Sequence, residues 1–277
     1  MAGELKRGDR DREGRRDVAR LQCLLNRIGG LLVPDGDFGA GTELAVRFAQ
    51  RLAGQAETGK AGRALLEFLA AQSLPSALVS VDGLTFIGRF EVASLTLYER
   101  RYLHPIKPSS ASGITIGVGY DLKFNSKAQF LADWAALPRT TLDRLAPLCR
   151  KAGSAADVAA LADLTVPWAI AWQVFCAVTV PAYDRMMLAA FPGAEALPDH
   201  RRAVLLSLVY NRGAGMAGDH RREMRAIRAL LRQGRPDGVA EELEKMSACG
   251  TATRRRERTG WAAADRAAQV TRRRASD

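Results

Sequence analysis

Apolar residues near the start of the chain recur at the spacing of a helix. Between residues 18 and 28 they return every three or four positions, which predicts a helix with one apolar face. Those positions are Val18, Leu21, Leu24, Leu25 and Ile28. Gly29-Gly30 is expected to end this helix, and residues 34–39 form a cluster of turn-forming residues.

Two further helical runs follow this turn. Thr42 is expected to cap a second helix, whose apolar content lies at residues 44–48. Residues 61–71 predict a third helix, and Ser73-Leu74-Pro75-Ser76 reads as a boundary. We therefore expect a small three-helix bundle over residues 1–75, followed by a second domain over residues 76–277.

The pattern changes between residues 82 and 125. Residues 86–102 predict one helix with Glu91 inside it, and Pro105 and Pro108 prevent its continuation. Residues 114–121 alternate between apolar residues and small or polar ones, which predicts a strand. One strand face would carry Thr115, Gly117, Gly119 and Asp121. The two glycines would leave a shallow floor on which a ligand can approach the backbone.

Helical periodicity dominates the rest of the chain. The apolar repeats fall at 128–137, 141–148, 155–163, 167–190, 199–210, 220–233 and 238–247. Residues 203–209 are apolar enough for a buried helix, and the four tryptophans are expected in the core. They are Trp134, Trp168, Trp172 and Trp261. The fold class is therefore mainly α, an α+β arrangement in which a helical domain carries a small β-hairpin.

Charge adds information about partners. The formal net charge is +11, and residues 200–277 hold 18 basic and 9 acidic groups, so they account for nearly all the excess. Such an excess favours a polyanionic partner such as nucleic acid, an anionic cell envelope or another acidic surface. The tail Arg272-Arg273-Arg274 is expected to fray.

Other classes of protein find little support in the sequence. The charged N-terminus does not resemble a secretory signal, and no apolar run is long enough for a membrane span. The four cysteines have no CxxC spacing and are expected to be buried free thiols. They are Cys23, Cys149, Cys176 and Cys249. We expect no metal and no cofactor, because the His and Cys residues are too scattered for a zinc site.

The first 70 residues resemble the peptidoglycan-binding module of cell-wall hydrolases. The matching elements are Leu5-Lys6-Arg7-Gly8-Asp9, Val18-Ala19-Arg20-Leu21-Gln22-Cys23-Leu24-Leu25-Asn26 and Asp35-Gly36-Asp37-Phe38-Gly39-Ala40-Gly41-Thr42. The chain departs from that family at Ala49-Gln50, where Phe-Gln is usual, and its second half-motif near Glu57-Thr58-Gly59 is weak. The resemblance implies binding to the saccharide or the stem peptide of peptidoglycan; the alternative is a module that only packs on its neighbour.

A helix acid followed by a hairpin hydroxyl suits the cleavage of a glycosidic bond. The leaving oxygen needs a proton from an acid that stays protonated near neutral pH, and a second group must orient water or stabilise the sugar cation. The apolar neighbours Phe90, Val92 and Leu95 are expected to raise the pKa of Glu91 by desolvation.

The same segment resembles the lysozyme-like domain of phage-type endolysins. The resemblance rests on Phe90-Glu91-Val92-Ala93-Ser94 with Tyr98, on Ser112 to Leu122, and also on Ser207 to Gly213 and Arg221 to Ile227. It extends over residues 80–270 and implies a muramidase that cleaves between N-acetylmuramic acid and N-acetylglucosamine. By that match Glu91 is the general acid and Thr115 is the hydroxyl residue beside the sugar.

The second catalytic group remains open at this level. Phage lysozymes place an Asp between the catalytic Glu and the hairpin, whereas Glu99 is the only other acid between Glu91 and Thr115. Glu99 is either the second carboxylate or a solvated residue facing Arg100 or Arg101. In the latter case Thr115 would hold the water, aided by Asp121 or Ser112.

Further candidates would line the cleft. The candidate substrate-binding residues are Ser112, Tyr120, Asp121, Asn211 and Arg212. Asp121 has an equal claim to capping the turn into the next helix. Asn211 and Arg212 are candidates because an Asn can bond an acetamido group; helix-end capping and a surface charge are their alternatives.

Other functions remain as alternatives. A non-catalytic murein-binding protein would explain the missing Asp, and a wall amidase or peptidase would need a zinc or Cys–His site. We expect peptidoglycan as the partner, with attraction to anionic envelope or lipopolysaccharide that weakens with salt, and no nucleic acid, since no such motif is present. We expect a monomer, made in the cytoplasm and released by a holin or injected as a toxin, in which case an immunity protein would be a partner.

Overall fold

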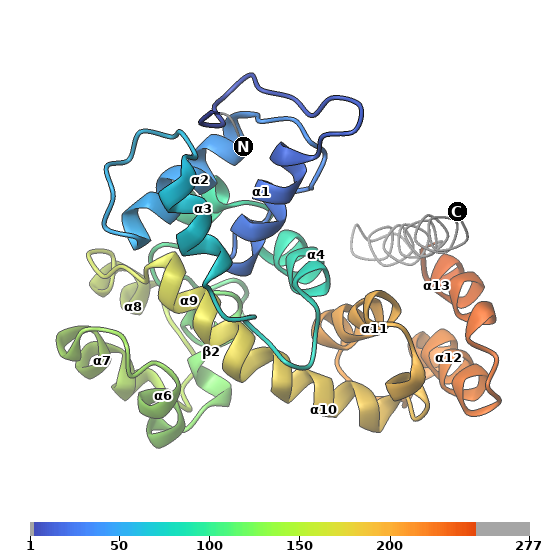
Figure 1. Ribbon diagram of the computed structural model, residues 1–277. Coiled ribbons are helices and arrows are strands. Elements are labelled where there is room, and N and C mark those ends of the chain that lie inside the picture. Colours follow the sequence, from blue (N-terminus) through green and yellow to red (C-terminus); the bar gives the residue numbers. More distant parts are fainter. Residues whose placement is uncertain (1–2, 248–277) are drawn as a thin grey trace. The chain divides into compact units, whose positions relative to one another are not determined.

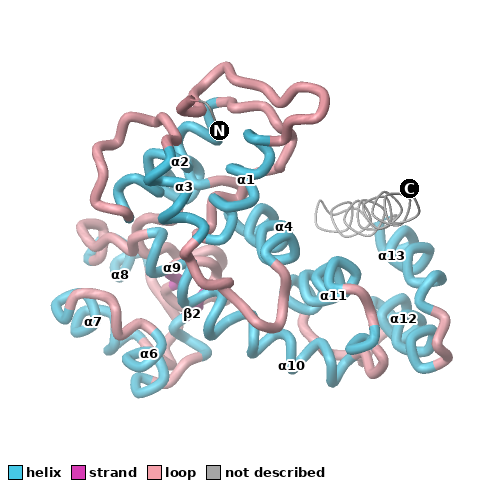
Figure 2. Tube along the Cα trace, in the orientation of Figure 1, coloured by secondary structure: helices cyan, strands magenta, loops and turns pink. Residues whose placement is uncertain are grey.

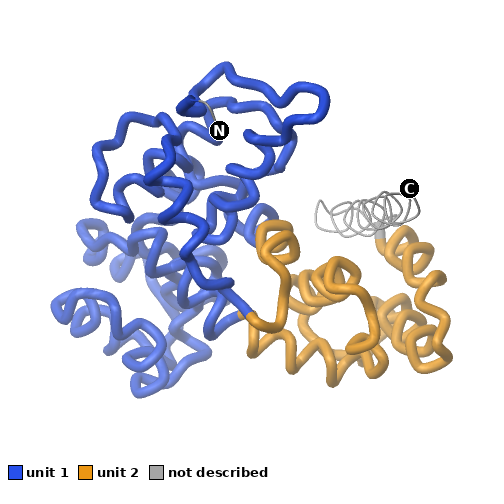
Figure 3. The backbone as a smooth tube through the Cα atoms, in the orientation of Figure 1, with its two compact units in different colours: residues 1–76, 88–179 blue, residues 77–87, 180–277 orange. Residues whose placement is uncertain are grey.

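The computed structural model describes residues 3–247, and the expectations for Cys249, Trp261 and Arg272 to Arg274 lie outside that range. The described chain is mainly helical with one small hairpin, which confirms the predicted fold class (Figures 1 and 2). It divides into two compact units, which Figure 3 colours separately. The first unit contains residues 1–76 and 88–179, and the second contains 77–87 and 180–277.

The first unit begins with the expected three-helix bundle. Its helices α1 (Asp17–Arg27), α2 (Ala40–Leu52) and α3 (Arg63–Ala70) all contact one another. The apolar face of α1 forms the bundle core, since Val18, Leu21 and Leu25 are buried. As predicted, α1 ends before Gly29, which has a positive φ of 85°.

The cap of the second helix differs from the prediction. Helix α2 begins at Ala40 after Gly39, so Thr42 lies inside its first turn and the prediction of Thr42 as the cap was wrong. The Thr42 hydroxyl instead accepts a hydrogen bond of 3.1 Å from Gln22 Nε2 on α1. The Thr42 side chain therefore bonds a residue of another helix, α1, and does not cap its own helix.

The helix predicted over residues 86–102 is two helices. Helix α4 (Val81–Val92) ends before Ala93, whose φ of 63° lies in the left-handed region, and α5 (Leu95–Arg101) follows. The Ser94 hydroxyl caps α5 by accepting a 3.2 Å hydrogen bond from the Leu97 amide. Glu91 therefore lies in the last turn of α4 and not in the middle of a longer helix.

The strand predicted over residues 114–121 is a tight hairpin. Strands β1 (Thr115–Ile116) and β2 (Tyr120–Asp121) pair antiparallel, with Ile116 opposite Tyr120. Gly117 and Gly119 form the turn with φ of 60° and 72°, so the expected glycine floor on a strand face was wrong. A Cβ on Gly117 would lie 2.6 Å from Trp134 Cη2, which explains why the turn has glycine there.

The remaining helices of the first unit follow the predicted periodicity. They are α6 (Lys127–Asp133), α7 (Arg139–Leu145), α8 (Ala155–Ala160) and α9 (Trp168–Val174), with a π-helical turn at Phe175–Thr179 and 3-10 turns at Leu122–Phe124 and Ala146–Leu148. Trp134, Trp168 and Trp172 are buried, as expected for core residues. Tyr98 of α5 joins this core, with its hydroxyl donating 2.8 Å to the Val166 carbonyl.

The second unit includes the first part of α4 and, between residues 180 and 247, four longer helices. They are α10 (Val180–Ala190), α11 (Asp199–Arg212), α12 (Arg222–Arg232) and α13 (Val239–Ser247), with 3-10 turns at Ala194–Ala196, Asp219–Arg221 and Pro236–Gly238. Residues 203–209 of α11 are all buried, as predicted. Arg202 and the buried Asp184 link α11 to α10 through bonds of 2.7 and 2.8 Å from one guanidinium nitrogen to both carboxylate oxygens.

Cysteine burial agrees with the prediction in part. Cys149 and Cys176 are buried, and burial raises the pKa of both thiols, whereas Cys23 is exposed. Within residues 3–247, no helix has the length and apolar character needed to cross a membrane. The same residues contain no group of three or more His, Cys, Asp or Glu side chains arranged to hold a metal ion.

Candidate functional site

Glu91 and Thr115, the two principal candidates, both belong to the first unit. Glu91 is half-buried in the last turn of α4, and its neighbours Val92 and Leu95 are buried. Thr115 opens strand β1 and is 6% exposed. The two side chains thus come from the end of a helix and the start of a hairpin, whereas the sequence placed Glu91 in the middle of a longer helix.

Helix α9 supports both of these elements. Gly88, three residues before Glu91, packs so closely on α9 that a Cβ there would lie 3.1 Å from Trp172 Cζ3. A Cβ on Gly117, in the hairpin turn, would lie 3.4 Å from the Cβ of Ala171. Adjacent residues of one helix therefore lie against the end of α4 and the hairpin turn, although the tightest limits on a side chain come from Leu31 at Gly88 and from Trp134 at Gly117.

The backbone of Thr115 is fully used, while its hydroxyl is not. Its amide donates 2.8 Å to the Ile106 carbonyl and its carbonyl accepts 2.9 Å from the Ile106 amide. Among residues 3–247, none hydrogen-bonds the Thr115 hydroxyl. The hairpin therefore holds this side chain in place and leaves its polar group for another partner.

Glu99 lies in a different environment. It is exposed on α5, a helix that contacts α2 of the bundle. The pKa of Arg51 on α2 is raised chiefly by its hydrogen bonds to Glu57 and, more weakly, by the negative charge of Glu99. Glu99 therefore contributes to the charged surface around Arg51, a partner that the sequence did not suggest.

The hairpin candidates have structural partners. The Asp121 carboxylate accepts hydrogen bonds from the amides of Gly113, at 3.1 Å, and Lys123, at 2.8 Å, so it caps the turn after β2. Ser112 Oγ lies 2.8 Å from Ser109 Oγ. These contacts correspond to the capping alternative for Asp121 and give Ser112 a role in shaping its own loop.

Tyr120 is a core residue of the hairpin. Its hydroxyl donates 2.7 Å to Asp133 Oδ2, and its ring packs edge-on against Trp134 with 5.4 Å between centroids. Burial, reinforced by the neighbouring Asp133, raises the pKa of Tyr120. Its hydroxyl is therefore a neutral donor already used within the protein.

Asn211 and Arg212 belong to the second unit and end α11. Asn211 Nδ2 donates 3.0 Å to the Ser207 carbonyl one turn earlier. Arg212 donates 2.8 Å to the His220 carbonyl, and Arg221 donates to the Arg212 carbonyl. The Asn211 bond lies within the end of α11, as in its helix-end alternative, whereas the Arg212 and Arg221 bonds connect α11 to the loop before α12.

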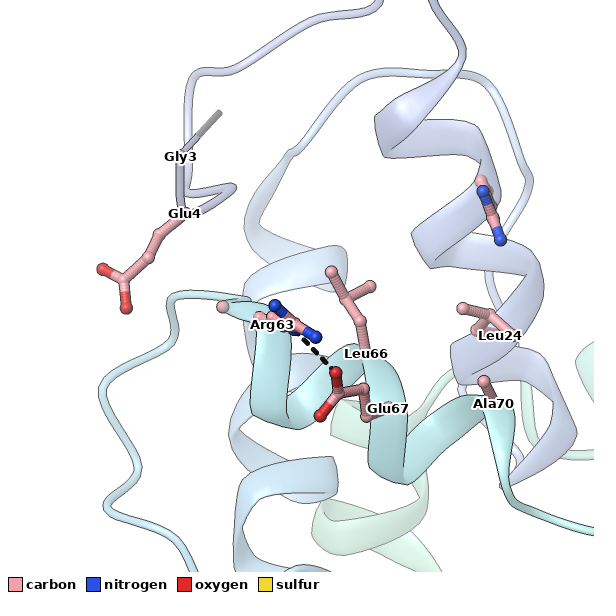
Figure 4. Close-up of a pocket in the computed structure, with 9 residues that line it drawn as sticks. Gly3, Glu4, Leu24, Arg63, Leu66, Glu67 and Ala70 are labelled. Carbon is pink, nitrogen blue, oxygen red and sulfur yellow. Dashed lines mark hydrogen bonds and ion pairs between the residues drawn. The ribbon is translucent and has the colours of Figure 1, made fainter. Parts of the chain in front are cut away.

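A groove between α1 and α3 is a site that the sequence analysis did not identify (Figure 4). It has a volume of about 670 Å³ and combines an apolar floor with charges of both signs. Its lining comprises Gly3, Glu4, Arg20, Leu24, Gly62, Arg63, Leu66, Glu67 and Ala70. Helical spacing in the sequence could have indicated the two faces that form the groove. Leu24 follows Arg20 by four residues and Glu67 follows Arg63 by four, so the members of each pair lie on one face of their helix.

Two glutamines organise the loops of the same bundle in the same way. Gln22 on α1 donates 2.9 Å to Asp35 Oδ1 and accepts 3.0 Å from the Gly36 amide. Gln50 on α2 donates 2.9 Å to Thr58 Oγ1 and accepts 2.9 Å from the Gly59 amide. Both glycines have positive φ, 78° and 74°. The weak second half-motif near residues 57–59 is thus a structural repeat of the first.

We expect Gln22→Met to lower the free energy of unfolding by about 1–3 kcal/mol. The thioether has almost the same shape but leaves the buried Gly36 amide without its acceptor. Urea unfolding of the full chain measures the change. Gln129→Met, at an exposed position on α6, is the control and should change stability little. Equal effects of the two substitutions would contradict a structural role for the Gln22 amide.

One family model matches this bundle. A search among curated proteins returned no match. Residues 14–69 match the family model described as "Putative peptidoglycan binding domain". The matched range contains α1, α2, α3 except its last residue, and both glutamine-held turns. The match supports a peptidoglycan-binding module at this end of the chain, with peptidoglycan as its partner.

Proposed function

We propose that this protein is a peptidoglycan hydrolase that cleaves the β-1,4 bond between N-acetylmuramic acid and N-acetylglucosamine. One observation carries the proposal: a peptidoglycan-binding module occupies the same compact unit as the last turn of α4, which contains Glu91, and the hairpin that bears Thr115. Gly88 of α4 and Gly117 of the hairpin turn both lie against α9, so one helix positions the two elements that carry the acid and the hydroxyl. A peptidoglycan-binding module in the same unit as Glu91 and Thr115 favours peptidoglycan as the substrate of the proposed hydrolysis.

Glu91 is the proposed general acid. This role requires a protonated carboxyl, and the half-buried position of Glu91 beside the buried side chains of Val92 and Leu95 is the feature that would favour that form. In that form it can protonate the glycosidic oxygen as the bond breaks. Thr115, whose hydroxyl is not used within residues 3–247, is proposed to orient water or the sugar beside the reacting carbon.

Analysis of the reaction products tests the proposal directly. The full chain is incubated with purified sacculi, and the released fragments are reduced with borohydride and identified by mass spectrometry. Reduced muramic acid ends are expected. Reduced glucosamine ends would indicate a glucosaminidase, and anhydromuramic ends a lytic transglycosylase. Cleaved stem peptides with intact glycan would indicate an amidase or peptidase instead.

A second candidate is a murein-binding protein without activity. Its specific support is the position of Glu99, the only other acid between Glu91 and Thr115, which interacts with Arg51 of the bundle. A lysozyme-type site without a second carboxylate depends wholly on Thr115 or a similar group for its water. Binding to sacculi without any released fragment would favour this candidate.

The proposed place of action is the cell wall, reached by release through a holin or by injection. Attraction to anionic envelope would come from the basic excess of residues 200–277. Part of that excess lies on described helices, but residues 248–277, with 8 basic and 3 acidic groups, lie outside the described range.

A further inference from the structure

We propose that the groove between α1 and α3 binds the peptide stem of peptidoglycan, at the diamino acid that carries a free ammonium and a free carboxylate. The inference rests on the wall-binding part of the proposed function and not on catalysis. It assigns the recognition to one surface of the module and to one chemical part of the wall polymer.

The charges of the groove are the first argument. Arg63 and Glu67 on α3 satisfy each other through a 2.7 Å ion pair, marked by the dashed line in Figure 4. Arg20 and Glu4 also line the groove, but neither forms an ion pair with any residue between 3 and 247. One cation and one anion are thus left for a ligand with charges of both signs.

The positions of these two charges favour a ligand that spans the groove. Arg20 belongs to α1, whereas Glu4 belongs to the N-terminal segment. The Glu4 carboxylate lies beside Gly62, which precedes α3: a Cβ on Gly62 would lie 3.2 Å from Glu4 Oε1. A ligand carboxylate would meet Arg20 and a ligand ammonium would meet Glu4. The diamino acid of a stem peptide carries both groups, whereas the glycan strand, apart from its stem peptides, carries neither.

The apolar part of the groove is the second argument. Leu24, Leu66 and Ala70 form a floor that suits alanine methyl groups and a methylene chain. The lining has no aromatic ring, although aromatic faces are the usual platform for a sugar ring. Phe38 and Phe48 of the bundle are buried in its core instead. The surface is therefore suited to peptide and not to saccharide.

The test measures binding of the full chain carrying Glu91→Gln, which prevents degradation of the wall. The probes are L-Ala-γ-D-Glu-meso-diaminopimelate, a chitin hexamer, intact sacculi, and sacculi stripped of stems by an amidase. We expect the tripeptide to bind, the hexamer not to bind, and stripping to reduce retention on sacculi at least about tenfold.

Substitutions assign the binding to this groove. Arg20→Ala and Glu4→Gln should each weaken tripeptide binding about threefold to tenfold, since each removes one charge-assisted contact. Arg16→Ala and Glu13→Gln are matched controls: both residues are exposed on the same module and neither lines the groove. The controls should bind as the parent does. Acetylation of the side-chain amine of the diaminopimelate, with the L-Ala amine left unchanged, should abolish the difference between Glu4→Gln and the parent.

Three outcomes would overturn the inference. They are equal retention on intact and stripped sacculi, binding of the hexamer in place of the tripeptide, and equal losses in the groove and control variants. Thermal unfolding of each variant checks the fold, and exposed residues without internal ion pairs should change it little. Tripeptide binding without any hydrolysis by the parent chain would refute the muramidase proposal alone, whereas hydrolysis without tripeptide binding would refute only the groove.

Discussion

Glu91→Gln is expected to lower the release of reducing ends from sacculi by about 10²- to 10⁴-fold. The amide has the shape of the acid but cannot give a proton to the glycosidic oxygen, so the bond must break without general acid catalysis. A reducing-sugar assay at equal protein concentration measures the loss. Retention on sacculi should be unchanged, because the residues that match the peptidoglycan-binding model end at position 69.

Glu99→Gln is the matched control for this experiment. Glu99 is exposed and lies near Arg51, so its substitution should leave most of the hydrolysis intact. A loss as large as that of Glu91→Gln would instead assign the second carboxylate to Glu99. Full activity of Glu91→Gln would refute the proposed general acid, and with it the muramidase mechanism.

Gly29→Ala is expected to destabilise the first unit by about 2–5 kcal/mol, through backbone strain added to overpacking. Gly29 has a φ of 85°, and a Cβ there would lie 2.8 Å from Trp172 Cδ2 and 2.9 Å from Trp168 Nε1. Trp168 Nε1 also donates 3.0 Å to the Gly29 carbonyl, so the ring cannot move away without losing that bond. Urea unfolding of the full chain gives the change in free energy.

Gly54→Ala separates the two causes. Gly54 also has a positive φ, 65°, but no heavy atom lies within 4 Å of the position that a Cβ would take. Its substitution should therefore cost only the backbone strain, about 1–2 kcal/mol. If both variants lowered the free energy of unfolding equally, Trp168 and Trp172 would have to move aside at little cost. That result would contradict tight packing between the bundle and α9.

The contact between Gly29 and Trp172 is important because α9 packs against several elements of the first unit. Trp172 meets Gly29, just after α1, as well as Gly88 of α4, while Ala171 meets the hairpin turn at Gly117. The bundle, the end of α4 and the hairpin therefore share one core within the first unit. A mutation that loosens this core should affect the candidate site as well as the module.

The sequence by itself determined most of the helical segments, although it did not show the break between α4 and α5. The spacing of Val18, Leu21 and Leu25 predicted the buried face of α1, and the apolar run at residues 203–209 predicted a buried helix. Local periodicity is sufficient for this, because a helix repeats its facing positions every three or four residues whatever it packs against. The sequence motifs of the first 70 residues also predicted a peptidoglycan-binding module, and the family match supports that prediction.

The tertiary structure decided where the chain turns and which side chains meet. The break at Ala93 and the turn at Gly117 depend on left-handed backbone conformations, and at Gly117 the distant Trp134 leaves no room for a side chain. Thr42 bonds Gln22 because another helix brings the amide within reach. The groove, likewise, exists only because α1 and α3 lie side by side. Periodicity reports the inward face of a helix, but the partner of that face is set by residues far away in the chain.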